Sequence, residues 1–296
     1  MITNQDYEIL YEIIKDVKFE KENFQTDDIL PLTEKIKNVG LSNEIEEKIY
    51  NHFSSDSELN IVYNWSINQY FCRILQSIIN NKKLKNVILN KLKNNVMNLI
   101  NHKNGNFMIV ECIKNLLSKD LQFIIKEIDN KIINLCCHKY GCRIIKNLIT
   151  FFDKETSNII INDIIENLDR LIKNQYGKYV IEHILYNKNI NFYNIIILKI
   201  INNCKYYATN KKSIYILGKL LDITFNDNLI QNEIDKESLL LAKNNRMKLL
   251  KILSLETYLN LLINNYFGIT IIKKLLSLNE TKNNVSNYIN NTSFFN

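Results

Sequence analysis

The feature that most constrains this chain is a short motif whose glycine returns every 36 residues. The three clearest copies are residues 102–109 (HKNGNFMI), 138–145 (HKYGCRII) and 174–181 (NQYGKYVI). They place Gly105, Gly141 and Gly177 at equal steps, and Gly268 heads a fourth copy in NYFGITII, so four of the six glycines share one phase. Self-similarity at such a period is the signature of stacked repeats.

Two weaker copies extend the array. Phe71 takes the glycine position one repeat before Gly105, and Ser213 takes it one repeat after Gly177. The next step, from Ser213 to Gly268, is much longer than one repeat, so we expect an acidic insertion near 223–238, after which Met247 to Leu255 forms the next helix. The expected organisation is 1–60 as divergent N-terminal repeats or a cap, 61–276 as the array, and 277–296 as a C-terminal tail or cap.

Composition favours helices for these repeats. The chain has one proline and six glycines, too few for the turns of a sheet-rich fold. We expect two helices in each unit: an apolar stretch such as Phe123 to Leu135, then a helix that starts near the glycine. A small residue there lets the entering chain pack closely on the preceding helix, so Phe71 is a misfit. Neighbouring units must stack to share a core, which predicts an all-α solenoid.

Charge is distributed unevenly along the chain. Residues 1–60 carry 6 lysines against 14 acidic residues, a net charge of −8, whereas residues 61–296 carry a net charge of +15. A basic body fits a polyanionic partner, although a solvated lysine surface explains the charge equally well. The six cysteines include no CxxC pair and indicate reduced thiols in an intracellular protein. Residues 1–16 lack the pattern of a signal peptide, and no apolar run is long enough to span a membrane.

One cluster, Cys136, Cys137, His138 and Cys142, superficially resembles a set of metal ligands. His102 occupies the same repeat phase as His138 but has no cysteine at the equivalent of 136 or 137. The histidine is therefore interpreted as a repeat feature, and no metal or other cofactor is expected. No paired carboxylates, nucleophile and base, or glycine-rich phosphate loop stands out, so the sequence does not indicate an enzyme.

The motifs YGCRII at 140–145, QYGKYVIEH at 175–183 and NGNF at 104–107 resemble Pumilio (PUF) repeats. The resemblance covers about 61–276, with Phe71 heading the third and Gly268 the eighth of that family's eight repeats. It implies a right-handed crescent of repeats that binds single-stranded RNA on its concave face, antiparallel to the protein. It also implies about one base per repeat, read by two or three side chains.

The copy headed by Phe71 keeps a complete family triplet. Cys72, Arg73 and Gln76 stand at positions i, i+1 and i+4 of a helix that turns by about 100° per residue, and so share one face. The resemblance assigns base-edge contacts to the first and third positions and stacking to the second, and it implies that the Cys/Gln pair reads adenine. A planar guanidinium can stack on bases, and an amide offers both a donor and an acceptor.

The other copies depart from this pattern. By resemblance, Asn106 with Phe107 matches a uracil reader, and Cys142 with Arg143 an adenine reader. At the third position these two copies have Val110 and Lys146 instead of the expected glutamine. Of the later copies, that of Ser213 retains only the ring of Tyr215, and that of Gly268 retains only the charge of Lys273. In the copy of Gly177, Tyr179 is the stacking residue, Glu182 is a candidate acceptor from guanine, and Lys178 is foreign to the pattern. The aromatic residues could instead belong to the core, but their common phase favours stacking, and the lysines are expected to line a phosphate track.

Three functions are compatible with these patterns. The leading hypothesis is a cytoplasmic, monomeric regulator of messenger RNA that recruits decay or translation-repression proteins through its convex face, without membrane association. The second is a divergent Pumilio-type protein, nucleolar rather than cytoplasmic, that binds ribosomal or structured RNA with little base selectivity. The third is a helical-repeat scaffold for protein–protein interaction.

Overall fold

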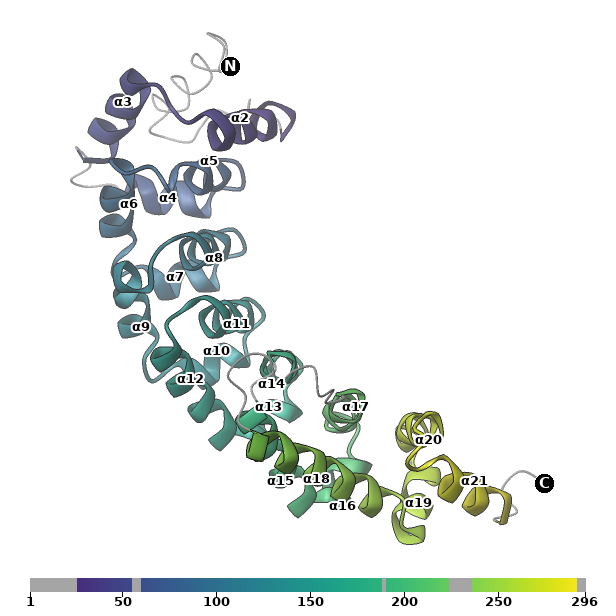
Figure 1. Ribbon diagram of the computed structural model, residues 1–296. Coiled ribbons are helices and arrows are strands. Elements are labelled where there is room, and N and C mark those ends of the chain that lie inside the picture. Colours follow the sequence, from purple (N-terminus) through teal and green to yellow (C-terminus); the bar gives the residue numbers. More distant parts are fainter. Residues whose placement is uncertain (1–25, 55–59, 188–189, 224–235, 292–296) are drawn as a thin grey trace. The chain divides into compact units, whose positions relative to one another are not determined.

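The structure is a computed structural model that describes residues 26–54, 60–187, 190–223 and 236–291. Two sequence predictions concern residues outside these ranges: that residues 1–16 are not a signal peptide, and most of the expected acidic insertion, because residues 224–235 are not described. The described residues form helices and no strands (Figure 1), which confirms the predicted all-α class. None of these helices is long and apolar enough to cross a membrane.

The chain divides into two compact units, Met1–Asn158 and Ile159–Asn296, which are described separately. Most of the first unit consists of three repeats of three helices, preceded by α2 (Thr26–Val39). The first helices of these repeats are α3 (Asn43–Ser54), α6 (Leu84–Leu92) and α9 (Gln122–Ile128), the last preceded by the short 3-10 helix η1 (Ser118–Leu121). The second helices are α4 (Ile61–Ile67), α7 (Val96–Asn101) and α10 (Ile132–Cys136), and the third helices are α5 (Phe71–Ile78), α8 (Gly105–Asn115) and α11 (Gly141–Phe151).

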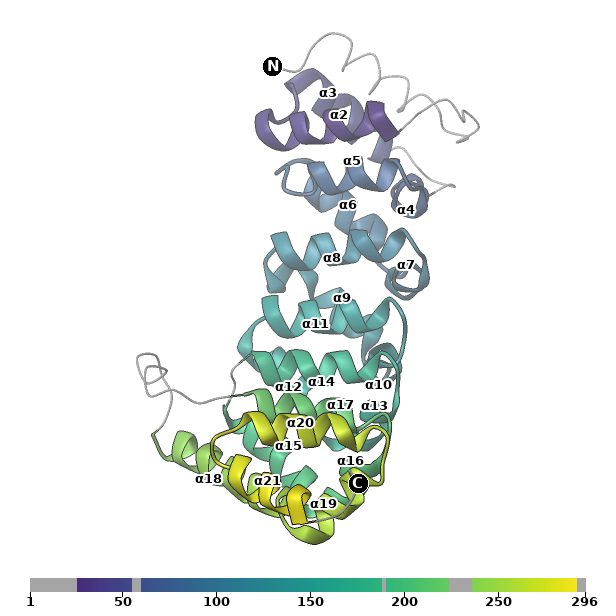
Figure 2. The same cartoon turned by 90° about the vertical axis from the view of Figure 1, so that its right-hand side faces the viewer.

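Equivalent helices of successive repeats pack on one another. In the first unit α2, α5, α8 and α11 form one row, as Figure 2 shows, while α3 packs on α6 and α4 on α7. α2 thus supplies the N-terminal member of the row of third helices, although its sequence shows no repeat motif. Because each helix buries one face against the next repeat, the apolar core runs through this stack.

The prediction of two helices per repeat is wrong, because each repeat contains three. The stretch from Phe123 to Leu135, expected as one helix, is divided between α9 and α10, and Asn130 between them has a positive φ of 44°. Asn94 has φ 64° at the same place between α6 and α7. Asparagine is one of the few residues that tolerate this left-handed conformation, which turns the chain and ends the helix.

The second unit continues the same design. α12 (Lys154–Glu166) begins in the first unit and leads into α13 (Leu168–Lys173) and α14 (Gly177–Tyr186). The next two repeats are α15 (Ile190–Asn202), α16 (Cys204–Thr209), α17 (Ile214–Asp222), and α18 (Lys236–Leu253), α19 (Glu256–Ile263), α20 (Gly268–Ser277). The helix α21 (Lys282–Asn291) packs on α19 and α20 at the C-terminal end, and α15 packs on α18, α16 on α19 and α17 on α20.

The first helix of the last repeat begins earlier than predicted. We expected it from Met247 to Leu255, but α18 starts at Lys236 and ends at Leu253. Leu239 and Ala242 are buried about one helical turn apart and extend the apolar face of α18 toward its N-terminus. The long step from Ser213 to Gly268 is therefore absorbed partly between α17 and α18 and partly by α18 itself, which has 18 residues where α15 has 13.

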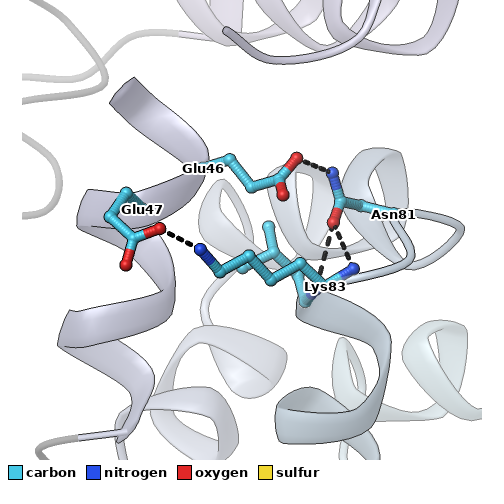
Figure 3. Close-up of polar contacts among 5 residues, drawn as sticks. Glu46, Glu47, Asn81 and Lys83 are labelled. Atoms are coloured by element: carbon cyan, nitrogen blue, oxygen red, sulfur yellow. Dashed lines mark hydrogen bonds and ion pairs between the residues drawn. The ribbon is translucent and has the colours of Figure 1, made fainter. Parts of the chain in front are cut away.

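Polar side chains also join neighbouring repeats about one repeat length apart. Figure 3 shows Asn81, whose amide donates to Glu46 at 2.6 Å and whose Oδ1 accepts the N–H groups of Lys83 (2.9 Å) and Leu84 (3.0 Å) at the start of α6. The ammonium of Lys83 pairs with the carboxylate of Glu47 on α3 (Figure 3). Such contacts hold successive first helices in register.

Candidate nucleic-acid interface

The third helices of each unit carry the residues that the sequence singled out. In four of them the glycine is the first residue of the helix and lies against the main chain of the preceding second helix. A Cβ at Gly141 would lie 2.6 Å from the carbonyl oxygen of Leu135, and one at Gly177 would lie 2.6 Å from that of Leu171. This is closer than real Cβ contacts, so only glycine lets the second and third helices of a repeat pack this tightly.

In five of the third helices, a side chain three positions before the first residue caps the helix. In the first unit Nδ1 of His102 accepts the N–H of Gly105 at 3.3 Å, and Nδ1 of His138 accepts that of Gly141 at 3.2 Å. Asn174 does the same for Gly177 in the second unit. The two histidines thus act as repeat features, as interpreted from the sequence. Among the described residues, no group of three or more His, Cys, Asp or Glu side chains could hold a metal ion.

The helix headed by Phe71 starts in the same way despite its bulky first residue. Oδ1 of Asn68 accepts the N–H of Phe71 at 3.1 Å, as Asn174 does for Gly177 at 3.0 Å. The ring of Phe71 is buried against Trp65, with ring centroids 5.2 Å apart. The misfit is therefore accommodated inside the repeat, and the start of α5 is preserved.

The second positions of the third helices point outward in the first unit. Arg73, Phe107 and Arg143 are all exposed, and the Phe107 ring has 45% of its surface accessible. The guanidinium carbon of Arg143 lies 4.9 Å from the centroid of the Phe107 ring, which joins the second positions of α8 and α11. These are the flat groups that stack on nucleobases.

In the first unit the first positions are buried, so the prediction that Cys72, Arg73 and Gln76 share one face open to a ligand is only partly right. Cys72 and Cys142 are 4% and 8% exposed, and their thiols donate to the carbonyl oxygens of Gln69 and Lys139 at 3.6 and 3.5 Å. Burial raises the pKa of both thiols. Their third-position partners, Gln76 and Lys146, are half-buried.

Asn106 and Val110 on α8 require a correction. Asn106 is fully buried, and its amide donates to the carbonyl oxygens of His102 (2.9 Å) and Lys103 (2.8 Å); Val110 is 7% exposed. The helices packed around α8 cover these two positions. The sequence prediction treated the helix as isolated and so could not account for this burial. Of the three predicted positions on α8, only Phe107 is open to a ligand in this structure.

In the second unit, the second positions of α14 and α17 form an aromatic pair. The rings of Tyr179 and Tyr215 have centroids 6.3 Å apart and an interplanar angle of 81°. Tyr179 is exposed and Tyr215 is half-buried. The ammonium of Lys178 lies 5.0 Å from the centroid of Tyr179 and 4.8 Å from that of Tyr215. Lys178 therefore contacts this pair instead of projecting into solvent.

Glu182 is already bound within the protein. One carboxylate oxygen accepts the hydroxyl of Tyr215 at 2.6 Å, and the other pairs with the ammonium of Lys219 at 2.8 Å. Burial and this hydrogen bond raise the pKa of Tyr215 to about 12, and the hydrogen bond to Glu182 raises the pKa of Lys219. A guanine edge would have to compete with both partners for the carboxylate.

Sequence reasoning missed Lys219 and Tyr186. The Lys219 ammonium lies 5.4 Å from the Tyr215 ring and 5.6 Å from the Tyr186 ring. One signal was available, because Tyr215 and Lys219 stand at i and i+4 and are therefore adjacent on α17. In the last repeat Lys273 is exposed, as are Ile269 and Thr270, and α20 carries no aromatic residue or guanidinium at the second position.

These features define a helical-repeat protein with flat and basic side chains at one phase of its third helices. Residues 95–128 and 131–165 match the family model of the Pumilio-family RNA binding repeat. The two matches start at the same spacing as the glycine motif. The resemblance to Pumilio (PUF) repeats noted in the sequence is thus confirmed for the two repeats at residues 95–128 and 131–165. No curated protein sequence matches it.

Solved structures share the fold. The Puf3 RNA binding domain bound to Cox17 RNA 3′ UTR recognition sequence site A is 21% identical, with a TM-score of 0.74 over 97% of this chain and 82% of that one. The Puf4 RNA binding domain bound to an HO endonuclease RNA 3′ UTR sequence is 17% identical, with a TM-score of 0.74 over 97% and 85%. The RNA-binding domain of yeast Puf5p bound to SMX2 RNA is 24% identical, with a TM-score of 0.67 over 96% and 80%. At these identities the likeness establishes the fold.

Proposed function

We propose that this chain binds single-stranded RNA along its third helices and catalyses no reaction. The observation that carries the proposal is the exposed, flat side chain at the second position of successive third helices, above all Phe107 beside Arg143. Stacking on such groups binds unpaired bases. The three similar structures above were each solved with RNA bound, which agrees with this assignment.

Phosphate contacts supply the second part of the binding. Lys146 on α11 is half-buried and Lys273 on α20 is exposed, both at the third-position phase of their helices. The net charge of +15 over residues 61–296 provides a favourable field for a polyanion.

The biological role we propose is post-transcriptional regulation of messenger RNA in the cytoplasm. In this role the protein acts as a monomer, reads about one base per stacking position, and recruits decay or translation-repression proteins through the surface away from the RNA. The support is the PUF-repeat fold, together with the 3′ UTR sequences bound in the Puf3 and Puf4 structures.

The test is the salt dependence of binding to a pool of single-stranded RNA. Log affinity should fall with log salt with a slope of about −0.7 per phosphate contact. Lys146→Ala and Lys273→Ala should each flatten that slope by about one such contact, whereas Lys251→Ala, an exposed lysine of the first helix α18, should not. Binding that does not respond to salt would contradict the proposal.

A second candidate function is RNA binding with little base selectivity. It is favoured by Asn106, which is fully buried, and by Glu182, whose carboxylate is bound by Tyr215 and Lys219. Selection from a random RNA pool separates the candidates. A sharp motif supports messenger RNA regulation, a loose preference supports the second candidate, and no enrichment favours a scaffold for protein interaction.

A further inference from the structure

The ammonium of Lys178 lies close to two aromatic rings of neighbouring repeats. It lies 5.0 Å from the ring centroid of Tyr179 on its own helix and 4.8 Å from that of Tyr215 on the next third helix. Both rings therefore share a cation–π contact with Lys178, and Tyr215 makes a second one with Lys219. Among the described residues no equivalent arrangement joins Phe107 and Arg143, because the residue before Phe107 is the buried Asn106.

A base held between Tyr179 and Tyr215 would need that same space. Stacking on both faces requires about 3.5 Å on each side, hence ring centres about 7 Å apart and nearly parallel. The two rings instead lie 6.3 Å apart at 81°, with the ammonium over both. Stacking of a base on the exposed Tyr179 ring requires Lys178 to leave, and stacking on both rings would also require Tyr215 to turn.

A second set of contacts holds Tyr215 in this orientation. Its hydroxyl donates to Glu182 at 2.6 Å, and Lys219 pairs with the other carboxylate oxygen at 2.8 Å while lying 5.4 Å from the Tyr215 ring. Turning the ring toward a base would break a hydrogen bond from a phenol to a charged carboxylate. Such bonds are among the stronger ones in proteins.

We propose that Lys178 fills the base-binding slot between Tyr179 and Tyr215, so that this step of the surface accepts no base and the RNA passes it through its phosphates. Lys178 is then a specificity-determining residue: it makes one step of the array blind to sequence. The inference rests on the RNA binding proposed above and concerns only the second unit.

The test compares abasic walks, in which each nucleotide of one bound RNA is replaced in turn by an abasic nucleotide. The probe is the tightest single-stranded sequence selected by the wild-type chain from a random pool. The variants are Lys178→Ser, Tyr179→Ala, the double variant of the two, and Lys212→Ser. Lys212 is exposed before α17, so its variant loses the same charge outside the slot.

The expected result is one additional sensitive nucleotide in Lys178→Ser alone. Loss of that base should weaken binding by roughly 5-fold to 150-fold, the range for stacking of one base. Adding Tyr179→Ala to the same chain should abolish the new sensitivity, and Lys212→Ser should give the wild-type walk.

Two outcomes overturn the inference while leaving RNA binding intact. One is a wild-type walk with a sensitive nucleotide that Tyr179→Ala removes, because a base then stacks there despite Lys178. The other is a Lys178→Ser walk identical to that of the wild type. If the wild-type chain enriches no RNA at all, the proposed function fails and this inference fails with it.

Discussion

The guanidinium carbon of Arg143 lies 4.9 Å from the centroid of the Phe107 ring and connects the exposed second positions of α8 and α11. The two residues are one repeat length apart in the sequence and occupy equivalent positions of neighbouring third helices. Both groups are flat and accessible, and the residue before Phe107 is the buried Asn106, where the copy of Gly177 has Lys178. We therefore regard this pair as the best-formed stacking step of the first unit.

Removing either member of this pair should weaken RNA binding. Arg143→Ala and Phe107→Ala should each cost about 1–3 kcal/mol, because each removes one stacking surface. Since the two side chains contact each other, the double variant should lose less than the sum of the single losses. Equilibrium titration with a fixed RNA measures all three variants. Arg170→Ala, an exposed arginine of α13, is the control and should bind as the wild type.

The repeat of α5 should distinguish adenine from other bases. Arg73 is exposed and Gln76 half-buried, so stacking and an edge contact remain available, while Cys72 adds a small apolar contact. Changing the adenine opposite this repeat, toward the 3′ side of the site, should cost about 1–3 kcal/mol. Cys72→Ser with Gln76→Glu should reverse the preference to guanine, because glutamate only accepts and guanine offers two donors. Equal affinity of both forms for all four bases would show that this repeat does not read sequence.

Glycines at the helix starts should tolerate alanine far less than the glycine inside α17. Gly141→Ala places a Cβ 2.6 Å from the Leu135 carbonyl oxygen, and it should destabilise the fold by about 1–3 kcal/mol. In Gly218→Ala the nearest atom is Cε of Lys274 at 3.2 Å, the flexible end of a side chain. There the gain in helix propensity of about 1 kcal/mol offsets the contact. Thermal unfolding followed by circular dichroism should show a lower midpoint for Gly141→Ala alone.

Acidification should remove the contribution of one ion pair in the second unit. Arg246 donates to Glu280 at 2.8 Å, and this hydrogen bond holds the pKa of Glu280 below its ordinary value of 4.5. A carboxylate with a depressed folded pKa stabilises the fold above its unfolded pKa, and the stabilisation is lost as pH falls through the folded pKa. Thermal midpoints measured from neutral pH to below 4.5 should therefore fall less steeply for Glu280→Gln than for the wild type.

The sequence by itself determined the repeat and its local geometry. The glycine phase follows from contacts within one repeat, between Gly141 and the main chain at Leu135 and between Gly141 and His138, so four copies carry the signal. The outward direction of Arg73 and Tyr179 follows from helical periodicity alone, and both are exposed. Local interactions of this kind recur with the motif and can be read from it.

The tertiary structure decided which of these positions remain open. Asn106 lies at a predicted reading position, yet it is fully buried. Glu182 is bound by Tyr215 and Lys219 of the next third helix, and Lys178 contacts the same Tyr215 ring. A helical projection of the sequence gives the direction of each side chain around one helix axis. It does not show which neighbouring helix the side chain contacts. Burial, ion pairing and the filling of a slot arise between packed helices, so only the packed stack determines them.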